Sequence, residues 1–117
     1  KLGSELLRPT LLSPETMALA TRPHFPELTG VLPGFGRQSP NPWGLGFEIK
    51  GTKQPHWTGS ENSAQTFGHF GRAGTFIWLD PRAQVFCVAL TDRQFGPWAS
   101  EAWPAFSNAV LAEAKSG

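Results

Sequence analysis

The stretch Gln65–Asp92, QTFGHFGRAGTFIWLDPRAQVFCVALTD, decides the fold of this chain. Its runs Thr66–Phe70, Thr75–Asp80 and Gln84–Thr91 are short, apolar or β-branched, and bounded by Gly, Pro or Asp, which favours strands over helices. The last two runs lack an apolar/polar alternation, so both of their faces are expected to be covered. Pro81 suits the second position of a type I turn. We therefore predict an antiparallel hairpin at the middle of a sheet.

Upstream of this stretch, residues 1–22 are predicted to be a helical lead-in. Leucines with helical spacing end at Pro9, and a second, short helix follows. Ser13 is a favourable N-cap and Pro14 suits the first helical position, so this helix should run from there to about Thr21.

Residues 23–42 contain five prolines and three glycines and are predicted to be a loop. Residues 43–93 are assigned to the sheet, and the segment from Trp43 to Lys50 supplies its fourth strand by strict alternation. One face of that strand would carry Trp43, Leu45, Phe47 and Ile49, and the other Gly44, Gly46, Glu48 and Lys50. The segment Gly51–Ser63 is predicted to be a polar loop. Its Trp57 could be part of a ligand platform, but packing under the Pro-rich loop is favoured.

The C-terminal segment, residues 97–115, is predicted to be an amphipathic helix. Pro104 should kink this helix or mark its true start. The expected apolar stripe is Trp98, Ala102, Ala105, Phe106, Ala109 and Val110.

Together these elements predict an α+β fold, with an antiparallel sheet of about four strands, a packed C-terminal helix and a short N-terminal helix. A single flanking helix would leave one face of this sheet poorly covered. The central hairpin, however, is expected to be buried on both faces. The 117 residues therefore suit one small domain or a piece of a larger one.

Composition excludes several classes of function. A net charge of +1 with no basic stripe argues against nucleic acid as a partner. No apolar run is long enough for a membrane span. The single cysteine, Cys87, cannot form an internal disulfide. It is predicted to be a small, buried apolar residue. His24, His56 and His69 lie on three separate elements, so no metal site is expected, and no motif indicates a cofactor.

One candidate site stands out, at His69, Phe70, Gly71 and Arg72. A histidine at a strand end, followed by glycine, suits a substrate lying along the strand edge. The N–H of Arg72 could then act as an oxyanion donor. On residue type alone, a lone histidine at a strand end is more often a structural residue.

Four segments carry a family resemblance. They are Trp43-Gly44-Leu45-Gly46-Phe47, Gly68-His69-Phe70-Gly71-Arg72-Ala73-Gly74, Leu79-Asp80-Pro81 and Leu90-Thr91-Asp92-Arg93. In order and spacing they are similar to the C-terminal part of the serine β-lactamase-related family, which includes class C β-lactamases, D-alanyl-D-alanine peptidases and esterases. Leu11-Leu12-Ser13-Pro14-Glu15-Thr16 resembles the helix that precedes that region. The resemblance implies that residues 1–117 form the C-terminal segment of a β-lactamase/transpeptidase-like, penicillin-binding-protein-like α/β sandwich.

The same resemblance implies roles for the candidate site. His69-Phe70-Gly71 matches the family's third motif in its His-x-Gly form, and Arg72 would give its N–H to the oxyanion hole. Phe70 stands where Thr or Ser is usual, which removes a hydroxyl that often binds the substrate carboxylate. The family's Ser-x-x-Lys motif is absent, because no serine has Lys three residues on. The Tyr-x-Asn form of its second motif is impossible, because the chain has no Tyr. Ser60-Glu61-Asn62 has the Ser-x-Asn spacing of the family's second motif. It lies shortly before His69, however, whereas the family places that motif far upstream of the third, so coincidence is favoured.

Two hypotheses follow. In the first, the chain is part of a serine hydrolase acting on a small-molecule ester or amide, and it is inactive alone because the Ser-x-x-Lys is absent. Its partner would be the missing N-terminal part of the same domain, or a second copy bound through the exposed sheet face. In the second, the chain is a non-catalytic α+β binding module or a catalytically degenerate relative. A Ser-x-x-Lys upstream of Lys1 in the reading frame would favour the first.

Overall fold

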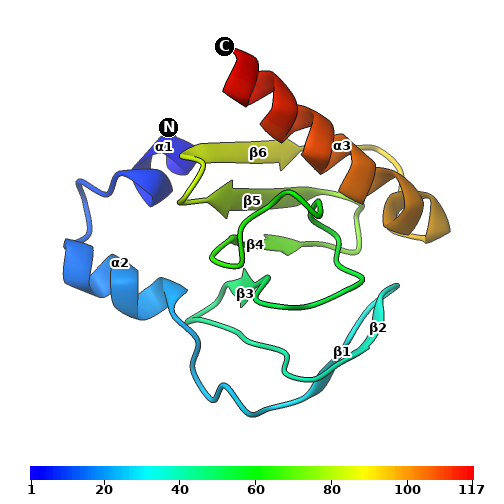
Figure 1. The fold of residues 1–117 in the computed structure, drawn as a ribbon, viewed down its shortest axis with the longest axis horizontal. Helices are drawn as coiled ribbons and strands as arrows, with labels where there is room; N and C mark the ends of the chain where they lie inside the picture. Colours follow the sequence, from blue (N-terminus) through cyan, green and yellow to red (C-terminus); the bar gives the residue numbers. More distant parts are fainter.

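A computed structural model describes all residues, 1–117, as a four-stranded antiparallel sheet flanked by helices, with a separate two-stranded hairpin (Figure 1). The sheet order is β3-β4-β5-β6, and β1 pairs only with β2. The elements are α1 (Leu2–Leu7), α2 (Pro14–Thr21), β1 (Gly30–Leu32), β2 (Gly36–Gln38), β3 (Glu48–Ile49), β4 (Phe67–Phe70), β5 (Phe76–Asp80), β6 (Val85–Ala89) and α3 (Pro97–Ser116). This arrangement confirms the predicted α+β class. None of the helices combines the length and the hydropathy that a membrane span requires.

The central hairpin forms as its sequence predicts. β5 and β6 pair antiparallel from Phe76 opposite Ala89 to Asp80 opposite Val85. The Asp80 carboxylate closes the turn by accepting the backbone N–H groups of Arg82 and Ala83 at 3.0 and 3.2 Å. A local side chain therefore satisfies the donors that the reversal leaves free.

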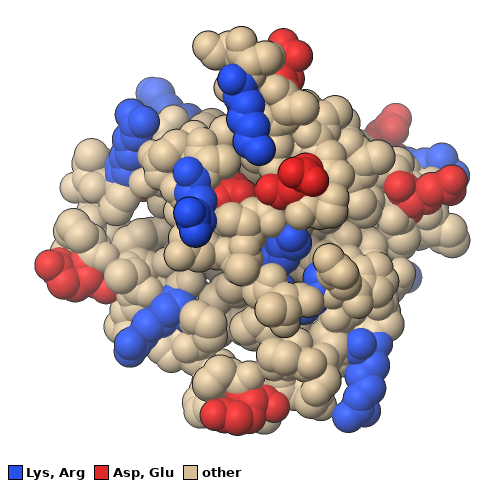
Figure 2. Space-filling view, in the orientation of Figure 1, with Lys and Arg blue, Asp and Glu red and all other residues tan.

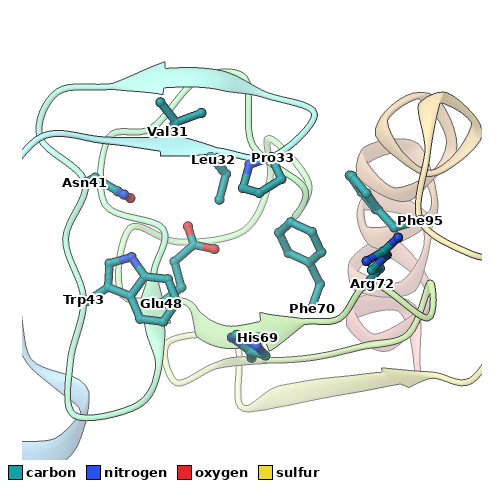
Figure 3. Close-up of a pocket in the computed structure, with 10 residues that line it drawn as sticks. All are labelled: Val31, Leu32, Pro33, Asn41, Trp43, Glu48, His69, Phe70, Arg72 and Phe95. Atoms are coloured by element: carbon teal, nitrogen blue, oxygen red, sulfur yellow. The ribbon is translucent and has the colours of Figure 1, made fainter.

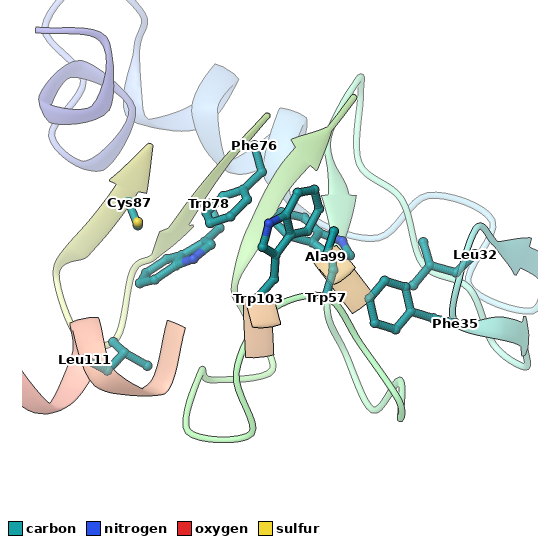
Figure 4. Close-up of a cluster of buried hydrophobic side chains, with 9 residues drawn as sticks. All are labelled: Leu32, Phe35, Trp57, Phe76, Trp78, Cys87, Ala99, Trp103 and Leu111. Carbon is teal, nitrogen blue, oxygen red and sulfur yellow. The ribbon is translucent and has the colours of Figure 1, made fainter. Parts of the chain in front are cut away.

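Helix α3 covers one face of the sheet and builds the larger of two cores (Figure 4). Its buried positions repeat every four residues, at Ala99, Trp103, Ser107 and Leu111. The indole N–H of Trp78, which is fully buried in β5, donates to the Ser107 hydroxyl at 3.0 Å. Aromatic side chains from the sheet, the loop after β3 and α3 thus interlock around this helix face.

The predicted apolar stripe of this helix was wrong by one position along most of its length. Ala102 and Phe106, assigned to the buried side, are exposed, whereas Trp103 and Leu111 are buried. The helix also begins at Pro97, so Pro104 lies inside it and does not start it. Alanines fit either side of a helix, so their spacing could not locate the face that the sheet aromatics select.

This register makes a testable contrast between two apolar residues of α3. Leu111→Ala is expected to lower the free energy of unfolding by about 2–5 kcal/mol, because it empties a fully packed position. Phe106→Ala should cost less than about 1 kcal/mol, since Phe106 is 49% exposed. Urea unfolding followed by circular dichroism measures both. Equal costs would contradict the register described here.

The opposite face of the sheet is covered only in part. Met17 of α2 packs with Ile49, Phe67 and Leu79, and α1 lies against β5 and β6. Further along the same face the side chains are exposed to solvent: Phe86 is 38%, Val88 49% and Leu90 83% exposed. The expected bare face is therefore confined to β6 and the residue after it, where Gly3 of α1 packs against Phe86 but the N-terminal helices leave these side chains partly or largely exposed. We call Phe86, Val88 and Leu90 the open sheet patch.

The strand predicted from Trp43 to Lys50 forms only at its end, as β3, and the prediction was wrong for the residues before Glu48. The chain turns back on itself there, so that Trp43 bridges to Glu48 and the Gly44 N–H donates to the Phe47 carbonyl at 2.8 Å. Gly46 has a φ of 87°, a left-handed value that glycine adopts without strain. The two glycines that suggested a flat strand face instead make a turn, which leaves Glu48 buried.

The loop predicted for residues 23–42 was wrong in part, whereas the loop predicted for Gly51–Ser63 and the packing role favoured for Trp57 are confirmed. The segment 23–42 carries the hairpin β1–β2, whose strands pair from Gly30 opposite Gln38 to Leu32 opposite Gly36. The segment Gly51–Ser63 has no strand or helix, but Trp57 is only 1% exposed. Its indole packs against Phe70 and Phe76, with ring centroids 5.5 and 5.6 Å apart.

Candidate functional site

The edge of β4 is free at the residues that the sequence singled out. β3 pairs only with Phe67 and Gly68, so no strand lies beside His69 and Phe70 on that side. On the other side, the Gly71 N–H donates to the Thr75 carbonyl at 2.9 Å. Because peptide groups alternate in direction along a strand, the N–H and C=O of Phe70 face the free edge. An extended ligand could pair with them there.

A cavity of about 410 Å³ lies against this edge (Figure 3). The hairpin β1–β2 forms one wall, and β4 with the turn after it forms another. The lining residues are Val31, Leu32, Pro33, Asn41, Trp43, Glu48, His69, Phe70, Arg72 and Phe95. We call this space the β4 cleft. Figure 2 shows positive and negative side chains interspersed over the face in view, with no broad patch of either sign.

Three of the four predicted site residues line the β4 cleft, and Gly71 does not. His69 is exposed, and its ring lies edge-on to the indole of Trp43 with centroids 6.0 Å apart. Phe70 is half-buried and packs its ring on Phe95 at 4.9 Å. Phe70, which stands where the resemblance implies Thr or Ser, therefore anchors β4 in the core and also lines the cleft.

Arg72 lies in the turn after β4 and is exposed. Its carbonyl accepts the Phe95 N–H at 3.0 Å, which ties the turn to the segment before α3. At Gly71 a side-chain β-carbon would lie 3.7 Å from the Thr75 hydroxyl, an ordinary contact, so packing within the chain does not require glycine there. The oxyanion role of the Arg72 N–H stays a prediction.

A buried charged cluster at the back of the cleft was missed by sequence reasoning. The Glu48 carboxylate accepts hydrogen bonds from the Trp57 indole N–H and from Nε2 of His56, the latter at 2.7 Å, and it pairs with the Lys53 ammonium. All four side chains are buried. A Lys and a His beside a Trp in an otherwise polar loop were the available signal. The alternation from Trp43 to Lys50 predicts Glu48 on the flat, glycine-lined face of a strand, which gives no indication that it meets these side chains.

His56 is held as a neutral imidazole. Its Nδ1 accepts the Thr58 backbone N–H at 3.2 Å, which leaves the ring proton on Nε2, facing Glu48. Burial lowers the pKa of His56 below its usual range, despite the neighbouring carboxylate. Burial alone would raise the pKa of Glu48, but the hydrogen bond from His56 and the charge and hydrogen bond of Lys53 outweigh it and lower that pKa.

These directions predict how stability depends on pH. A histidine whose folded pKa is lowered favours the folded state above its unfolded pKa of about 6.5, and this contribution is lost as the pH falls below that value. The urea midpoint should therefore decrease from pH 8 to pH 5, with further loss below about pH 4.5 as Glu48 protonates in the unfolded chain. His56→Gln should flatten the dependence between pH 8 and 5. An unchanged slope in that variant would contradict the assignment to His56.

The Ser60-Glu61-Asn62 triplet lies outside the cleft. The Ser60 hydroxyl accepts from Nδ2 of Asn108, and the Glu61 N–H donates to Oδ1 of the same residue, both at 3.0 Å. The Asn62 side chain accepts the Gly59 N–H at 2.8 Å. These bonds fasten the loop to α3 and to itself. No group of three His, Cys, Asp or Glu side chains is placed to hold a metal ion.

Comparison with known proteins identifies similar solved structures. No protein-family model and no curated protein matches the chain. The chain is 57% identical to a beta-lactamase from Mycobacterium bovis, with a TM-score of 0.94. The match covers 97% of this chain and 42% of the Mycobacterium bovis chain, so the present chain spans less than half of that protein's length. This likeness confirms both the resemblance inferred from the sequence and the fold class.

Proposed function

Since the chain is related to a β-lactamase over nearly its whole length, we propose that it is the substrate-binding part of a serine hydrolase. In this proposal the edge of β4 holds an ester or amide substrate, His69 contacts its polar group, and the Arg72 N–H completes an oxyanion hole. The nucleophile comes from another part of the protein, because no serine in the chain has Lys three residues on.

The free edge of β4 beside the β4 cleft is the observation that carries the proposal. Because β3 pairs with β4 only as far as Gly68, the peptide groups of Phe70 on that edge are available to a ligand, and the cavity beside them supplies space for it. Phe70, with no hydroxyl, favours simple esters and amides over carboxylate-bearing β-lactams or D-alanyl peptides.

The open sheet patch supports a second element of the proposal, a protein partner. Exposed apolar side chains on one sheet face are typical of a surface that another structural layer covers. We propose that the missing layer comes from the remainder of the same domain, with self-association of the chain as the weaker arrangement.

Reconstitution tests this function. The chain is mixed with the part of the Mycobacterium bovis protein that it does not match, and p-nitrophenyl ester and fluorescent penicillin turnover are measured, with the intact Mycobacterium bovis protein as reference. The chain alone should show no turnover above background, and the mixture should hydrolyse at least one substrate that the reference hydrolyses. A stable mixture that is inactive on every such substrate would contradict the proposal.

A further inference from the structure

We propose that Asn41 and Trp43 form a recognition site at one end of the β4 cleft, where their side-chain N–H groups bind an acceptor oxygen on the apolar, non-reacting group of the substrate. The inference rests on the proposed function and adds a substrate class to it: esters or amides whose apolar group carries a further carbonyl-type oxygen. The Arg72 N–H serves the reacting carbonyl in that function, so the two sites bind different atoms of one substrate.

The wall of the cleft is apolar over much of its extent. Leu32 is 3% exposed and fixes the hairpin β1–β2 over the cavity, whereas Val31, 72% exposed, stands at the rim. Phe95 lies at the end of the cleft opposite Asn41 and Trp43 (Figure 3). A cavity of about 410 Å³ with such a lining suits a small apolar group, whose orientation is then set by a few polar side chains.

Glu48 offers the cleft no acceptor, although it lines the cavity. Its Oε1 accepts the indole N–H of Trp57, and its Oε2 is bonded to both His56 and Lys53. The side chain is only 2% exposed. A ligand that brought an N–H or O–H donor to this part of the cleft would therefore find no free carboxylate oxygen.

The accessible polar atoms of Asn41 and Trp43 are donors. Oδ1 of Asn41 is buried, so the amide nitrogen with its two N–H groups is the polar atom that the side chain offers to the cleft. The indole nitrogen of Trp43 can only donate, and it lies on the side of its ring that faces Asn41 (Figure 3). The indole N–H groups of Trp57, Trp78 and Trp98 each donate to an oxygen of the chain, whereas that of Trp43 does not.

This pair of donors selects the chemistry of the ligand. A carbonyl oxygen has two lone pairs, so a single oxygen can accept from Asn41 and from Trp43 together. An apolar group without an acceptor would cover the two donors and leave them unpaired, which costs binding free energy. Sites built to form hydrogen bonds reject analogues that lack the matching atom for this reason.

The test titrates two probes of the same shape into the ¹⁵N-labelled full chain. 4-Phenylcyclohexanone carries one carbonyl oxygen, and (4-methylidenecyclohexyl)benzene has a CH₂ group in place of that oxygen. The ketone should shift the indole N–H signal of Trp43 downfield as the hydrogen bond forms, and the alkene should not. The indole N–H of Trp98 is already bonded to the Gln94 carbonyl at 2.6 Å, and its signal is the internal control. The same titrations give both dissociation constants.

Three variants test the two donors separately. Trp43→Phe removes one donor and keeps an aromatic ring, and Asn41→Leu removes the other and keeps the branching of the side chain. Each should lower the ratio of ketone affinity to alkene affinity about fivefold, the size of one net hydrogen bond. A general loss of affinity would not change this ratio. Trp98→Phe, the same replacement at a tryptophan that does not line the cleft, should leave it unchanged.

An unchanged ratio in Trp43→Phe or Asn41→Leu, an unshifted Trp43 signal, or no binding of the ketone up to its solubility limit would overturn the inference. Neither probe needs a nucleophile, so failure here is distinguishable from failure of the reconstitution. Hydrolysis by the reconstituted protein together with an unchanged ratio would reject this recognition site and keep the proposed function.

Discussion

Glu48→Gln is expected to lower the free energy of unfolding by about 3–5 kcal/mol, the usual cost of removing one member of a buried ion pair. The carboxylate is 2% exposed and its Lys53 partner is 0% exposed, so the ammonium would remain buried without a counter-charge. Glutamine keeps the size of the side chain and one acceptor. The loss therefore reports the charge more than the packing, and urea unfolding at pH 7.5 measures it.

A second substitution separates the effect of the buried charge from the effect of side-chain packing. In Glu48→Gln/Lys53→Met neither charge remains, and at least half of the lost stability should return, because removing both members of a buried pair is often nearly neutral. Glu61→Gln, at an exposed acid of the same region, is the control and should stay within about 0.5 kcal/mol of wild type. If the single variant costs less than about 1 kcal/mol, the buried pair does not hold this loop in place.

His69→Ala is expected to reduce p-nitrophenyl ester turnover of the reconstituted protein by about 100-fold, the scale of losing one group that acts on the transition state. The side chain is exposed on the free edge of β4 and contributes to neither buried core. Stability should therefore change by less than about 0.5 kcal/mol, which separates a loss of activity from a loss of fold.

His24→Ala is the matched control for this variant. Its ring bonds to the Leu19 carbonyl at 2.8 Å, and it does not line the β4 cleft, so turnover should be unchanged. An unaltered rate in His69→Ala would remove His69 from the proposed site while leaving the fold assignment intact. Comparable losses in both variants would indicate a structural cause.

Short-range chemistry explains why several elements were predicted correctly. The Asp80-Pro81 turn is closed by the carboxylate of Asp80 itself, within three residues. Ser13 caps α2 by accepting the Thr16 N–H at 3.1 Å, and Pro14 occupies the first helical position. Each of these signals acts between neighbours in the chain, so it does not depend on the rest of the fold.

The candidate site was predictable only in part. His69 could be found because a strand end followed by glycine is a local pattern. The walls opposite it, Val31 and Leu32, come from a hairpin in a segment whose prolines and glycines predicted only a loop. Asn41 also lines the cavity and carries no local signal, because its place there depends on how its segment packs after folding.

Sequence alone thus determined the central hairpin, the capped second helix, the C-terminal helix and the position of His69, since each depends on spacing or on contacts within a few residues. Tertiary structure decided which side of α3 is buried, that Glu48 turns inward to meet Lys53 and His56, and that β3 stops beside Gly68. The physical reason is that burial depends on partners distant in the chain. The buried face of a helix, the burial of a charged side chain and the free edge of a strand are defined only when those partners are in place.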